Sequence, residues 1–416
     1  MRLLYVQQHF ATGRGEAGVR GYNLVRTLVA RGHDVTVVSG HNWRDRSTAA
    51  GKGRLVDETE TEGFRIVRIG VPYSNHMSFP ARVGSFLSWA LLASWVVLRR
   101  PADLVFASST PLTVSIPALA ARFLRGLPYA FEVRDLWPDL AVEMGVVRNG
   151  LLRWFLYRWE RIAYRRASWL VALAPGIADG IVAKAGIPRE RVAMIPNGCD
   201  TVGILPLPGR PRRHLGVPDD AFVLGFTGTH GPANGLPAVL DAAAELKRRG
   251  RTGILLVLVG DGRDKAALVE RARREGLDNV RFLGLFGKDR YAEVLAEFDV
   301  GMQILKNVPG FRWGTSPNKF FDYLAAGRPV LVNYPGWMAS IVEEGGCGVA
   351  VPPDDPAAFA DAVERLAAGR DRLPAMGAAA RRVAEERFAQ VRILSDLAEF
   401  LERGMAARVR PPGKRP

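Results

Sequence analysis

The feature that most constrains the fold is a repeated alternation of short apolar runs with amphipathic helical patterns along nearly the whole chain. Short apolar runs separated by helix-length segments are typical of parallel strands joined by helices. In the first half we expect strands at 2–7, 34–39, 64–69, 103–107, 128–133, 168–173 and 191–195. In the second half we expect them at 222–227, 254–259, 279–283, 299–303, 329–333 and 348–352. The pattern predicts an α/β fold with two doubly wound, Rossmann-like domains.

A segment rich in Gly and Pro, residues 203–211, interrupts this alternation and is expected to link two domains. A chain of 416 residues is long enough for both. We therefore predict an N-terminal domain over 1–203 and a C-terminal domain over 204–390. A last helix is expected over 391–409, followed by a basic tail over 410–416.

Charge and cysteine content restrict the partners and the compartment. The net charge of +15 favours an acidic partner, such as a phosphorylated substrate, an anionic lipid or nucleic acid. The two cysteines are too few for a disulfide framework and suit a reducing cytoplasm. The first strand begins at once, so no secretory signal is expected. No histidine pair has metal-ligand spacing, and we expect neither a metal site nor a cofactor.

One uncharged run, residues 83–98, raises the question of a membrane span. A span needs about 20 apolar residues, and this run is shorter and ends at Arg99. We expect a helix of the core or one that lies at a membrane surface.

Each half carries a Gly-rich turn between its first strand and the following helix. The first, 13–18, fits G-x-G-x-x-G and includes Gly15 and Gly18. No acidic residue closes the second strand, as a dinucleotide site would require, so a plain tight turn is the alternative. The second, 226–235, suits a diphosphate because glycines and a helix N-terminus expose N–H groups. Ligands of such sheets bind at the carboxyl ends of the strands.

The segment 314–330 combines a helix start with charged residues. Ser316 is expected at the N-cap and Pro317 at the first helical position. Lys319 and Asp322 are three residues apart and share one helix face. The lysine is expected to bind phosphate and the aspartate ribose hydroxyls. The alternative is a surface ion pair.

Polar residues also follow the fifth expected strand. Glu132, Arg134 and Asp135 lie at its carboxyl end, and Glu143 lies just beyond. Such charges are expected in a cleft, although a structural ion pair beneath the loop is the alternative.

Residues 148–170 are rich in arginine and aromatic residues. This composition fits a helix that lies on an anionic membrane, or one that stacks on nucleic acid. A helix with its aromatic residues turned inward is the alternative.

The chain resembles glycosyltransferase family 4, whose members are retaining enzymes of the GT-B fold, over nearly its whole length. The resemblance is carried by residues 31–37, Ile195-Pro196-Asn197-Gly198, residues 258–262 and Lys319 through Val330. Residues 131–139 resemble the bacterial branch that contains fucosamine transferases of surface-polysaccharide assembly. Two motif positions differ: the first family glutamate falls on Gly314, and the family's loop lysine falls near Asn234.

The resemblance implies a nucleotide-sugar donor held by the C-terminal domain, an acceptor on the N-terminal domain, and transfer with retention and without a metal. It also implies a last helix that returns to the first domain. The expected donor-binding residues are Gly15, Gly18, Gly228, Thr229, His230, Gly260, Leu285, Arg312, Ser316, Pro317, Asn318, Lys319 and Asp322. Asp135, Arg134 and Lys319 are the expected catalytic residues, and Glu132 and Glu143 the expected acceptor-side residues.

The resulting hypothesis is a UDP-sugar-dependent transferase of an N-acetylated hexosamine, with a lipid-diphosphate-linked saccharide as acceptor. Such an enzyme would work in O-antigen or capsule synthesis, in the cytoplasm and bound peripherally to the inner face of the plasma membrane. Two alternatives are a GT-B-fold UDP-sugar 2-epimerase, which needs no acceptor, and a nucleic-acid-binding protein. Because no nucleic-acid-binding module is recognisable, nucleic acid is not an expected partner.

Overall fold

The computed structural model describes residues 1–12, 20–40, 55–74, 77–207 and 212–409. The chain divides into two compact units, one of residues 1–196 and 392–416 and the other of residues 197–391. The described part of segment 203–211 belongs to the second unit. The C-terminal segment from Arg392 belongs to the first.

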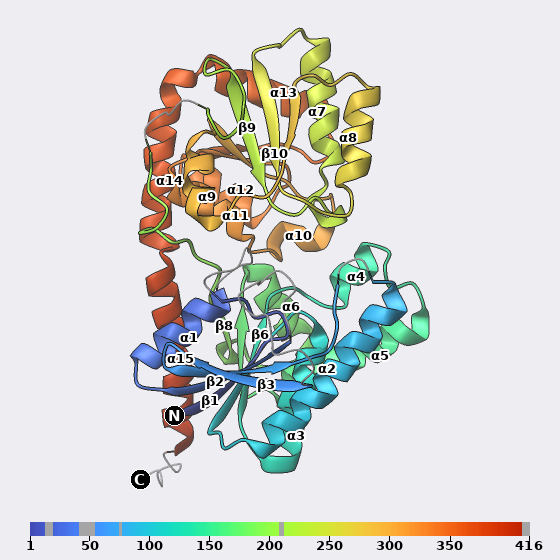
Figure 1. The fold of residues 1–416 in the computed structure, drawn as a ribbon, viewed down its shortest axis with the longest axis vertical. Coiled ribbons are helices and arrows are strands. Elements are labelled where there is room, and N and C mark those ends of the chain that lie inside the picture. The colour runs from blue at the N-terminus through green and yellow to red at the C-terminus, as the bar shows by residue number, and fades with distance from the viewer. Residues whose placement is uncertain (13–19, 41–54, 75–76, 208–211, 410–416) are drawn as a thin grey trace. The chain divides into compact units, whose positions relative to one another are not determined.

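The first unit is built on an eight-stranded sheet in the order β3-β4-β2-β1-β5-β6-β7-β8 (Figure 1). Its strands are β1 (Arg2–Val6), β2 (Asp34–Gly40), β3 (Val56–Thr61), β4 (Phe64–Ile69), β5 (Leu104–Ser108), β6 (Tyr129–Val133), β7 (Trp169–Ala172) and β8 (Val192–Met194). Its helices are α1 (Arg20–Ala30), α2 (Phe79–Arg99), α3 (Ser115–Arg125), α4 (Asp139–Glu143), α5 (Gly150–Arg166), α6 (Pro175–Ala185) and most of α15 (Gln390–Val409).

The second unit has a six-stranded parallel sheet in the order β11-β10-β9-β12-β13-β14. Its strands are β9 (Phe222–Thr227), β10 (Ile254–Val259), β11 (Val280–Leu283), β12 (Val300–Gln303), β13 (Val330–Val332) and β14 (Gly348–Ala350). Its helices are α7 (Pro237–Arg248), α8 (Lys265–Arg274), α9 (Lys288–Ala296), α10 (Pro309–Trp313), α11 (Asn318–Ala325), α12 (Trp337–Glu344), α13 (Pro356–Ala368) and α14 (Leu373–Arg387). Each strand predicted from the apolar runs is present, and the predicted α/β fold with two Rossmann-like domains is confirmed.

One strand, β3, was not predicted. It lies at one edge of the first sheet, and among the described strands it is the one that pairs antiparallel. A turn at Glu62 and Gly63 joins it to its partner β4. Both turn residues have positive φ, the backbone of a two-residue hairpin. The sequence Val-Asp-Glu-Thr-Glu-Thr carries no apolar run because an edge strand is covered on fewer sides.

Fully buried apolar side chains pack the strands against the helices. In the second unit the core includes Phe226, Leu256, Met302 and Phe359, each 3% exposed or less. These residues come from β9, β10, β12 and α13, so the core joins sheet and helices. Burying a large apolar side chain stabilises a fold by about 1.5–3 kcal/mol, which makes this cluster the main support of the sheet.

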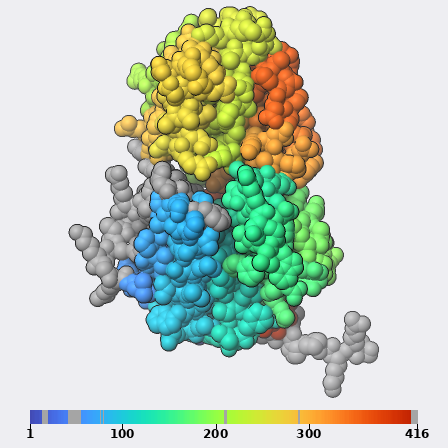
Figure 2. All heavy atoms as spheres, turned by 90° about the vertical axis from the view of Figure 1, so that its right-hand side faces the viewer, coloured from blue at the N-terminus to red at the C-terminus, as the bar shows by residue number. Residues whose placement is uncertain are grey.

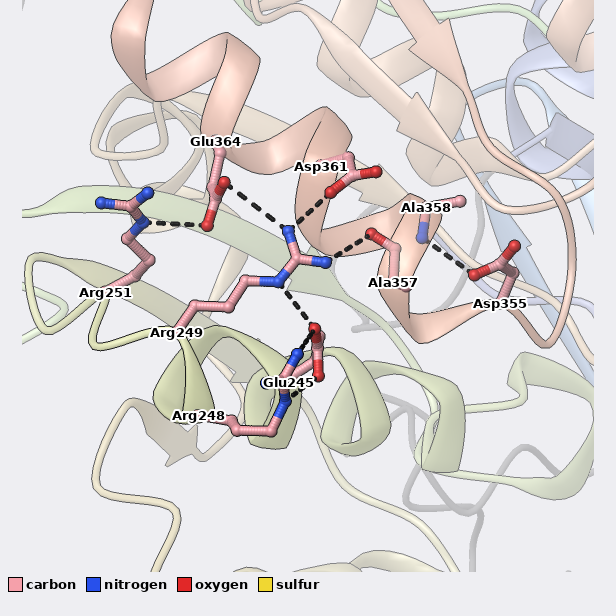
Figure 3. A network of polar contacts seen from close by, with 9 residues as sticks. All are labelled: Glu245, Arg248, Arg249, Arg251, Asp355, Ala357, Ala358, Asp361 and Glu364. Carbon is pink, nitrogen blue, oxygen red and sulfur yellow. Dashed lines mark hydrogen bonds and ion pairs between the residues drawn. The ribbon is translucent and has the colours of Figure 1, made fainter.

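A polar network fixes α7 to α13 on the surface of this core (Figure 3). The guanidinium of Arg249 donates 2.6 Å hydrogen bonds to Glu245 and Asp361. Arg251 pairs with Glu364 of α13 over 2.9 Å. The side-chain hydrogen bonds from Arg248 and Arg249 lower the pKa of Glu245 to about 2, so this carboxylate stays charged at neutral pH.

Candidate functional site

The strand order of the second unit reverses between β9 and β12, and this reversal locates its ligand edge. β9 is followed in the chain by β10 on one side of it, whereas β12 lies on the other side. Loops that leave such a point in opposite directions open a crevice at the carboxyl ends of the strands. The loop after β9 carries Gly228 to Asn234, and the segment after β12 leads to α11 with Lys319 and Asp322. The fold therefore brings the two predicted motifs of this unit to one edge.

Lys319 contacts three parts of the Gly-rich loop. Its Nζ donates a 2.8 Å hydrogen bond to Oδ1 of Asn234 and lies 3.9 Å from the centre of the Phe226 ring. Gly228 has φ +142°, and a Cβ placed there would stand 3.1 Å from the same Nζ. Burial lowers the pKa of Lys319 to about 7. No acidic partner is paired with this ammonium among the described residues, so the site has an unneutralised cation beside a glycine loop.

Asp322 lies one turn further along α11. The hydroxyl of Tyr291 donates to its Oδ2 over 3.2 Å. Burial raises the pKa of Asp322 to about 7, the Tyr291 bond lowers it, and nearby Asp200 raises it further. The alternative of a surface ion pair between Lys319 and Asp322 is wrong, because each has another partner and no salt bridge joins them in the described chain.

The expected cap at Ser316 is also wrong. α11 begins at Asn318 after Pro317, whose backbone is extended, and no side chain caps it. The Ser316 hydroxyl instead accepts a 2.9 Å hydrogen bond from the backbone N–H of Asn197. The amide of Asn197 in turn donates to the Ser316 carbonyl. Because Asn197 belongs to the Pro-Asn-Gly motif, the serine anchors that motif to the start of α11.

Three neighbouring loops of the same edge are locked together. Gly260 has φ +145°, and a Cβ there would be 1.9 Å from the carbonyl oxygen of Gly228. Lys265 Nζ donates to the carbonyl oxygens of Gly260 and Leu283 over 2.8 and 2.9 Å. The carboxyl ends of β9, β10 and β11 are thus held at fixed spacing, and Leu285 follows them with an exposed side chain.

His230 lies at the centre of these loops. It is fully buried, and neither ring nitrogen has a hydrogen-bond partner within the described chain. Burial, aided by Lys265, lowers the pKa of His230 to about 4, so its ring is neutral. The backbone carbonyl of the neighbouring Thr229 accepts a 2.7 Å hydrogen bond from the side-chain amide of Asn234.

The other predicted donor residues are not joined to this cluster. Arg312 lies on α10 with an exposed side chain, and in the described segments no hydrogen bond connects it to Lys319 or Asp322. Gly15 and Gly18 fall outside the described residues.

In the first unit, Glu132 is held in a buried ion pair. Arg20 Nε contacts its Oε2 at 3.0 Å, and the Ser108 hydroxyl donates to its Oε1 over 2.8 Å. Burial alone would raise the pKa of Glu132, but Arg20, Arg134 and Ser108 outweigh it and hold the pKa below its usual value. Both oxygens are engaged within the fold, which matches the structural ion-pair alternative.

Asp135 and Arg134 follow the carboxyl end of β6 and are more exposed than Glu132. Both are half-buried, and the backbone N–H of Arg134 donates to the Ser109 hydroxyl over 3.0 Å. Burial raises the pKa of Asp135 although Arg134 lowers it. The described residues provide no hydrogen bond or ion pair to the Asp135 carboxyl. Glu143, at the end of α4, is exposed.

Sequence reasoning missed Tyr291 and Arg20. Nothing in the pattern around Tyr291 distinguishes it from a core tyrosine. Arg20 had a signal: a cation in the first turn of a helix is unfavourable and calls for a specific partner. Across the described ranges, no group of His, Cys, Asp and Glu could hold a metal ion.

The comparisons with known proteins agree with this division of the chain. Residues 15–198 match a glycosyl transferase 4-like domain, and residues 221–369 match glycosyl transferases group 1. The chain is 25% identical to the probable glycosyltransferase WbjE of Pseudomonas aeruginosa over 64% of its length and 66% of that protein. It is 27% identical to the GDP-mannose-dependent alpha-(1-6)-phosphatidylinositol monomannoside mannosyltransferase of Mycobacterium tuberculosis, over 98% of this chain and all of that one. The match covers 49% of a D-inositol 3-phosphate glycosyltransferase of Nocardia farcinica, so the chain spans about half to two thirds of several curated relatives.

Solved structures share the fold. Anabaena HepE in complex with UDP-glucose superposes with a TM-score of 0.71 at 19% identity, over 97% of this chain and all of that one. Sucrose-phosphate synthase of Thermosynechococcus elongatus gives a TM-score of 0.76 at 16% identity, over 98% and 99% of the two chains. The predicted GT-B fold class is confirmed by these neighbours. Residues 15–198 thus form a glycosyl transferase 4-like domain, and residues 221–369 form a domain of the group 1 glycosyltransferases.

Proposed function

We propose that the chain is a retaining, metal-independent glycosyltransferase that moves an N-acetylated hexosamine from a UDP-linked donor to a lipid-diphosphate-linked saccharide. The observation that carries this proposal is the half-buried Lys319 ammonium, which faces the Gly228 loop with Asp322 one turn away. A cation beside closely packed backbone suits a diphosphate, and a carboxylate at that distance suits ribose hydroxyls. The UDP-glucose named in the HepE complex supports a nucleotide sugar of this kind.

The proposed chemistry is a front-face substitution at the anomeric carbon. The bond between that carbon and the departing diphosphate oxygen breaks as the acceptor oxygen attacks the same face. Lys319 stabilises the negative charge that develops on the leaving phosphate. That phosphate takes the acceptor proton, so no metal or added base is needed. Asp135, whose pKa is raised by burial, orients the acceptor hydroxyl together with Arg134.

A lipid-linked acceptor is supported by the surface of the first unit. On α2 the residues Val83, Leu87, Leu91 and Trp95 follow one another at every fourth position and are 38–66% exposed. The opposite side of α2 is buried, with Trp89 and Val97 fully covered. One helix of the described chain, Pro80–Arg99, is long and apolar enough to cross a bilayer, and 33% of its most apolar window is buried. We propose that it lies on the membrane instead.

The basic helix α5 belongs to the same unit, and α3 packs against both α2 and α5. Trp154 and Phe155 of α5 are 63% and 53% exposed, so the alternative of inward-facing aromatics fails for these two. The α2 segment, blue, and the α5 segment, teal, are both visible on the face shown in Figure 2. Exposed aromatics flanked by arginines suit the interface of an anionic bilayer. The relative named for a phosphatidylinositol mannoside acceptor supports a lipid glycoside here. We therefore propose a peripheral enzyme of the inner membrane face that works in surface-polysaccharide synthesis.

Donor binding and turnover test the function. The full chain is screened by thermal shift against UDP-N-acetylglucosamine, UDP-glucose, GDP-mannose and dTDP-glucose, since a ligand that binds the folded state raises its melting temperature. The proposal expects the largest shift with the UDP-N-acetylhexosamine. NMR of the sugar with and without a lipid-diphosphate-sugar acceptor then follows the anomeric signal. Transfer with inverted configuration, or epimerisation without acceptor, contradicts the proposal.

Vesicle sedimentation tests the membrane part separately. Wild type is expected to bind vesicles of 30% phosphatidylglycerol at low salt, and binding should fall about tenfold in Trp154→Ser/Phe155→Ser. Val391→Ser, an exposed apolar residue on α15, is the control and should bind as wild type. Equal binding of wild type and the double variant contradicts the assigned surface while leaving donor binding untouched.

A further inference from the structure

The second unit also contains a cavity that is separate from the candidate donor site. Its volume is about 730 Å³, within the roughly 300–1,000 Å³ of small-molecule pockets. It is lined in part by Asp299 and Arg328, which stand just before β12 and β13. The cavity is therefore at the amino ends of the strands, whereas Lys319 and Asp322 are placed at the carboxyl ends.

The wall of the cavity carries more basic than acidic residues. The basic residues are Arg328, Arg370, Arg381 and Arg382, and the acidic residues are Asp299 and Glu385. Both acids already have partners. Asp299 Oδ2 lies 2.7 Å from Arg212 and 3.3 Å from Arg370, and Glu385 lies 2.6 Å from Arg381. The positive charges of Arg328 and Arg382 are left over.

These two arginines are short of acceptors. Arg328 donates through Nη2 to the Leu207 carbonyl over 2.7 Å, but its buried Nε has no partner within the described chain. Burial lowers the pKa of Arg328, although nearby Asp299 raises it. Arg382 is exposed on α14 and has no ion pair or hydrogen bond with the described residues. A buried donor without an acceptor is destabilising, and a bound anion would supply the missing acceptor.

We propose that this cavity is a binding site for a small soluble phosphate monoester or diphosphate, with Arg328 and Arg382 as its cationic ligands. Excess positive charge on the wall suits such an anion, and guanidinium groups bind phosphate oxygens in pairs. Leu207, Leu373 and Pro374 form an apolar part of the wall, where the organic group of a monoester would pack. The site is separate from that of the nucleotide sugar.

Isothermal titration calorimetry of inorganic pyrophosphate into the full chain tests the proposal, with Lys319→Ala used to separate this cavity from the donor site. Wild type is expected to bind one pyrophosphate saturably at a site that Lys319→Ala leaves intact. Arg382→Glu should weaken that binding about tenfold or more, as expected for loss of a charge-assisted contact. Arg274→Glu, an exposed arginine of α8 in the same unit, changes the net charge equally and should leave binding within about twofold of wild type.

A second variant tests whether pyrophosphate occupies the cavity itself, without changing the charge of the wall. Ala378 lines the cavity on an exposed part of α14, so Ala378→Phe fills the space without removing a cation. It too should weaken pyrophosphate binding about tenfold or more, while UDP binding persists. No saturable binding by wild type, or wild-type binding by both variants, overturns the proposal. If phosphatidic acid vesicles bind through Arg382 and soluble pyrophosphate does not, a soluble ligand is ruled out as well.

Discussion

The ammonium of Lys319 donates its hydrogen bond to Asn234, 2.8 Å away, near the loop position at which the family resemblance implies a lysine. Asn234 is itself fixed, because its amide donates to the Thr229 carbonyl over 2.7 Å. The Lys319 ammonium is thus held against a fixed loop, which suits the role proposed for it at the diphosphate.

Gly228→Ala is expected to damage the site without harming the fold. The new Cβ would stand 3.1 Å from Lys319 Nζ at a backbone φ of +142°, which L side chains rarely adopt. Lys319 would be displaced, and donor affinity should fall about tenfold or more. Gly231→Ala in the same loop meets only a methyl group at 3.5 Å and is the matched control. Calorimetry with UDP measures both, and equal affinities would refute the role given to Gly228.

Donor affinity should fall as pH rises above about 7. Burial lowers the pKa of Lys319 to about 7 in the unliganded protein, and a bound diphosphate raises it, so binding takes up a proton. The charged lysine contributes to donor affinity below this pKa. Above it the lysine is neutral in the free protein, and donor affinity falls by at most about tenfold per pH unit. Asp322, whose pKa is also about 7, complicates the profile, so Asp322→Asn is used as background. A flat profile from pH 6 to 9 in that variant contradicts the prediction.

Arg20→Met should destabilise the first unit strongly. Arg20 and Glu132 are 5% and 1% exposed, and Arg20 also donates to the carbonyl oxygens of Ile195 and Pro196. Removing one partner of a buried pair costs about 3–5 kcal/mol. Arg26→Met on the same helix breaks an exposed pair with Glu62 and should cost no more than about 1 kcal/mol. Urea unfolding compares them, and similar midpoints would show that the buried pair is unimportant.

Glu402→Gln should remove an acid-sensitive contact of α15. Hydrogen bonds from Arg31, helped by His33, outweigh a burial effect that raises the pKa of Glu402, and they lower it from 4.5 to about 2. The stabilisation is complete above pH 4.5 and is lost as the pH falls toward 2. It is expected to be at most about 1 kcal/mol because the pair is partly exposed. Glu399→Gln, whose contact with Arg31 is 3.9 Å, is the control. Thermal unfolding at pH 3 and pH 6 should show a smaller pH effect in Glu402→Gln than in that control.

The fold was largely predictable because every described strand except β3 is paired in parallel and most of these strands are buried. A buried parallel strand has to be apolar on both faces, so runs such as Ile254–Val259 are visible without any structure. β3 escaped prediction because its Asp, Glu and Thr residues face solvent at the edge. Helix starts were less predictable: the extended backbone at Pro317 moves the start of α11 past Ser316.

Two candidate site residues can be placed together from the sequence when they belong to one motif. Residues that are distant in the sequence cannot be paired in this way. Lys319 and Asp322 share a helical turn, so their common face follows from spacing. Tyr291 meets Asp322 from α9, and Arg20 meets Glu132 across 112 positions, which only the folded chain reveals. A local pattern does not show whether a carboxylate such as Glu132 is buried against an arginine or open to a ligand.

Calorimetric titration of UDP into wild type, Lys319→Ala, Asp322→Asn and Lys247→Ala tests the central claim most directly. Lys247 is an exposed lysine of the same unit and serves as the charge-matched control. The account predicts that Lys319→Ala and Asp322→Asn each weaken UDP binding by about tenfold to a hundredfold, as for lost hydrogen bonds to charged groups, while Lys247→Ala binds as wild type. Unchanged UDP affinity in Lys319→Ala, with the fold intact, would contradict it.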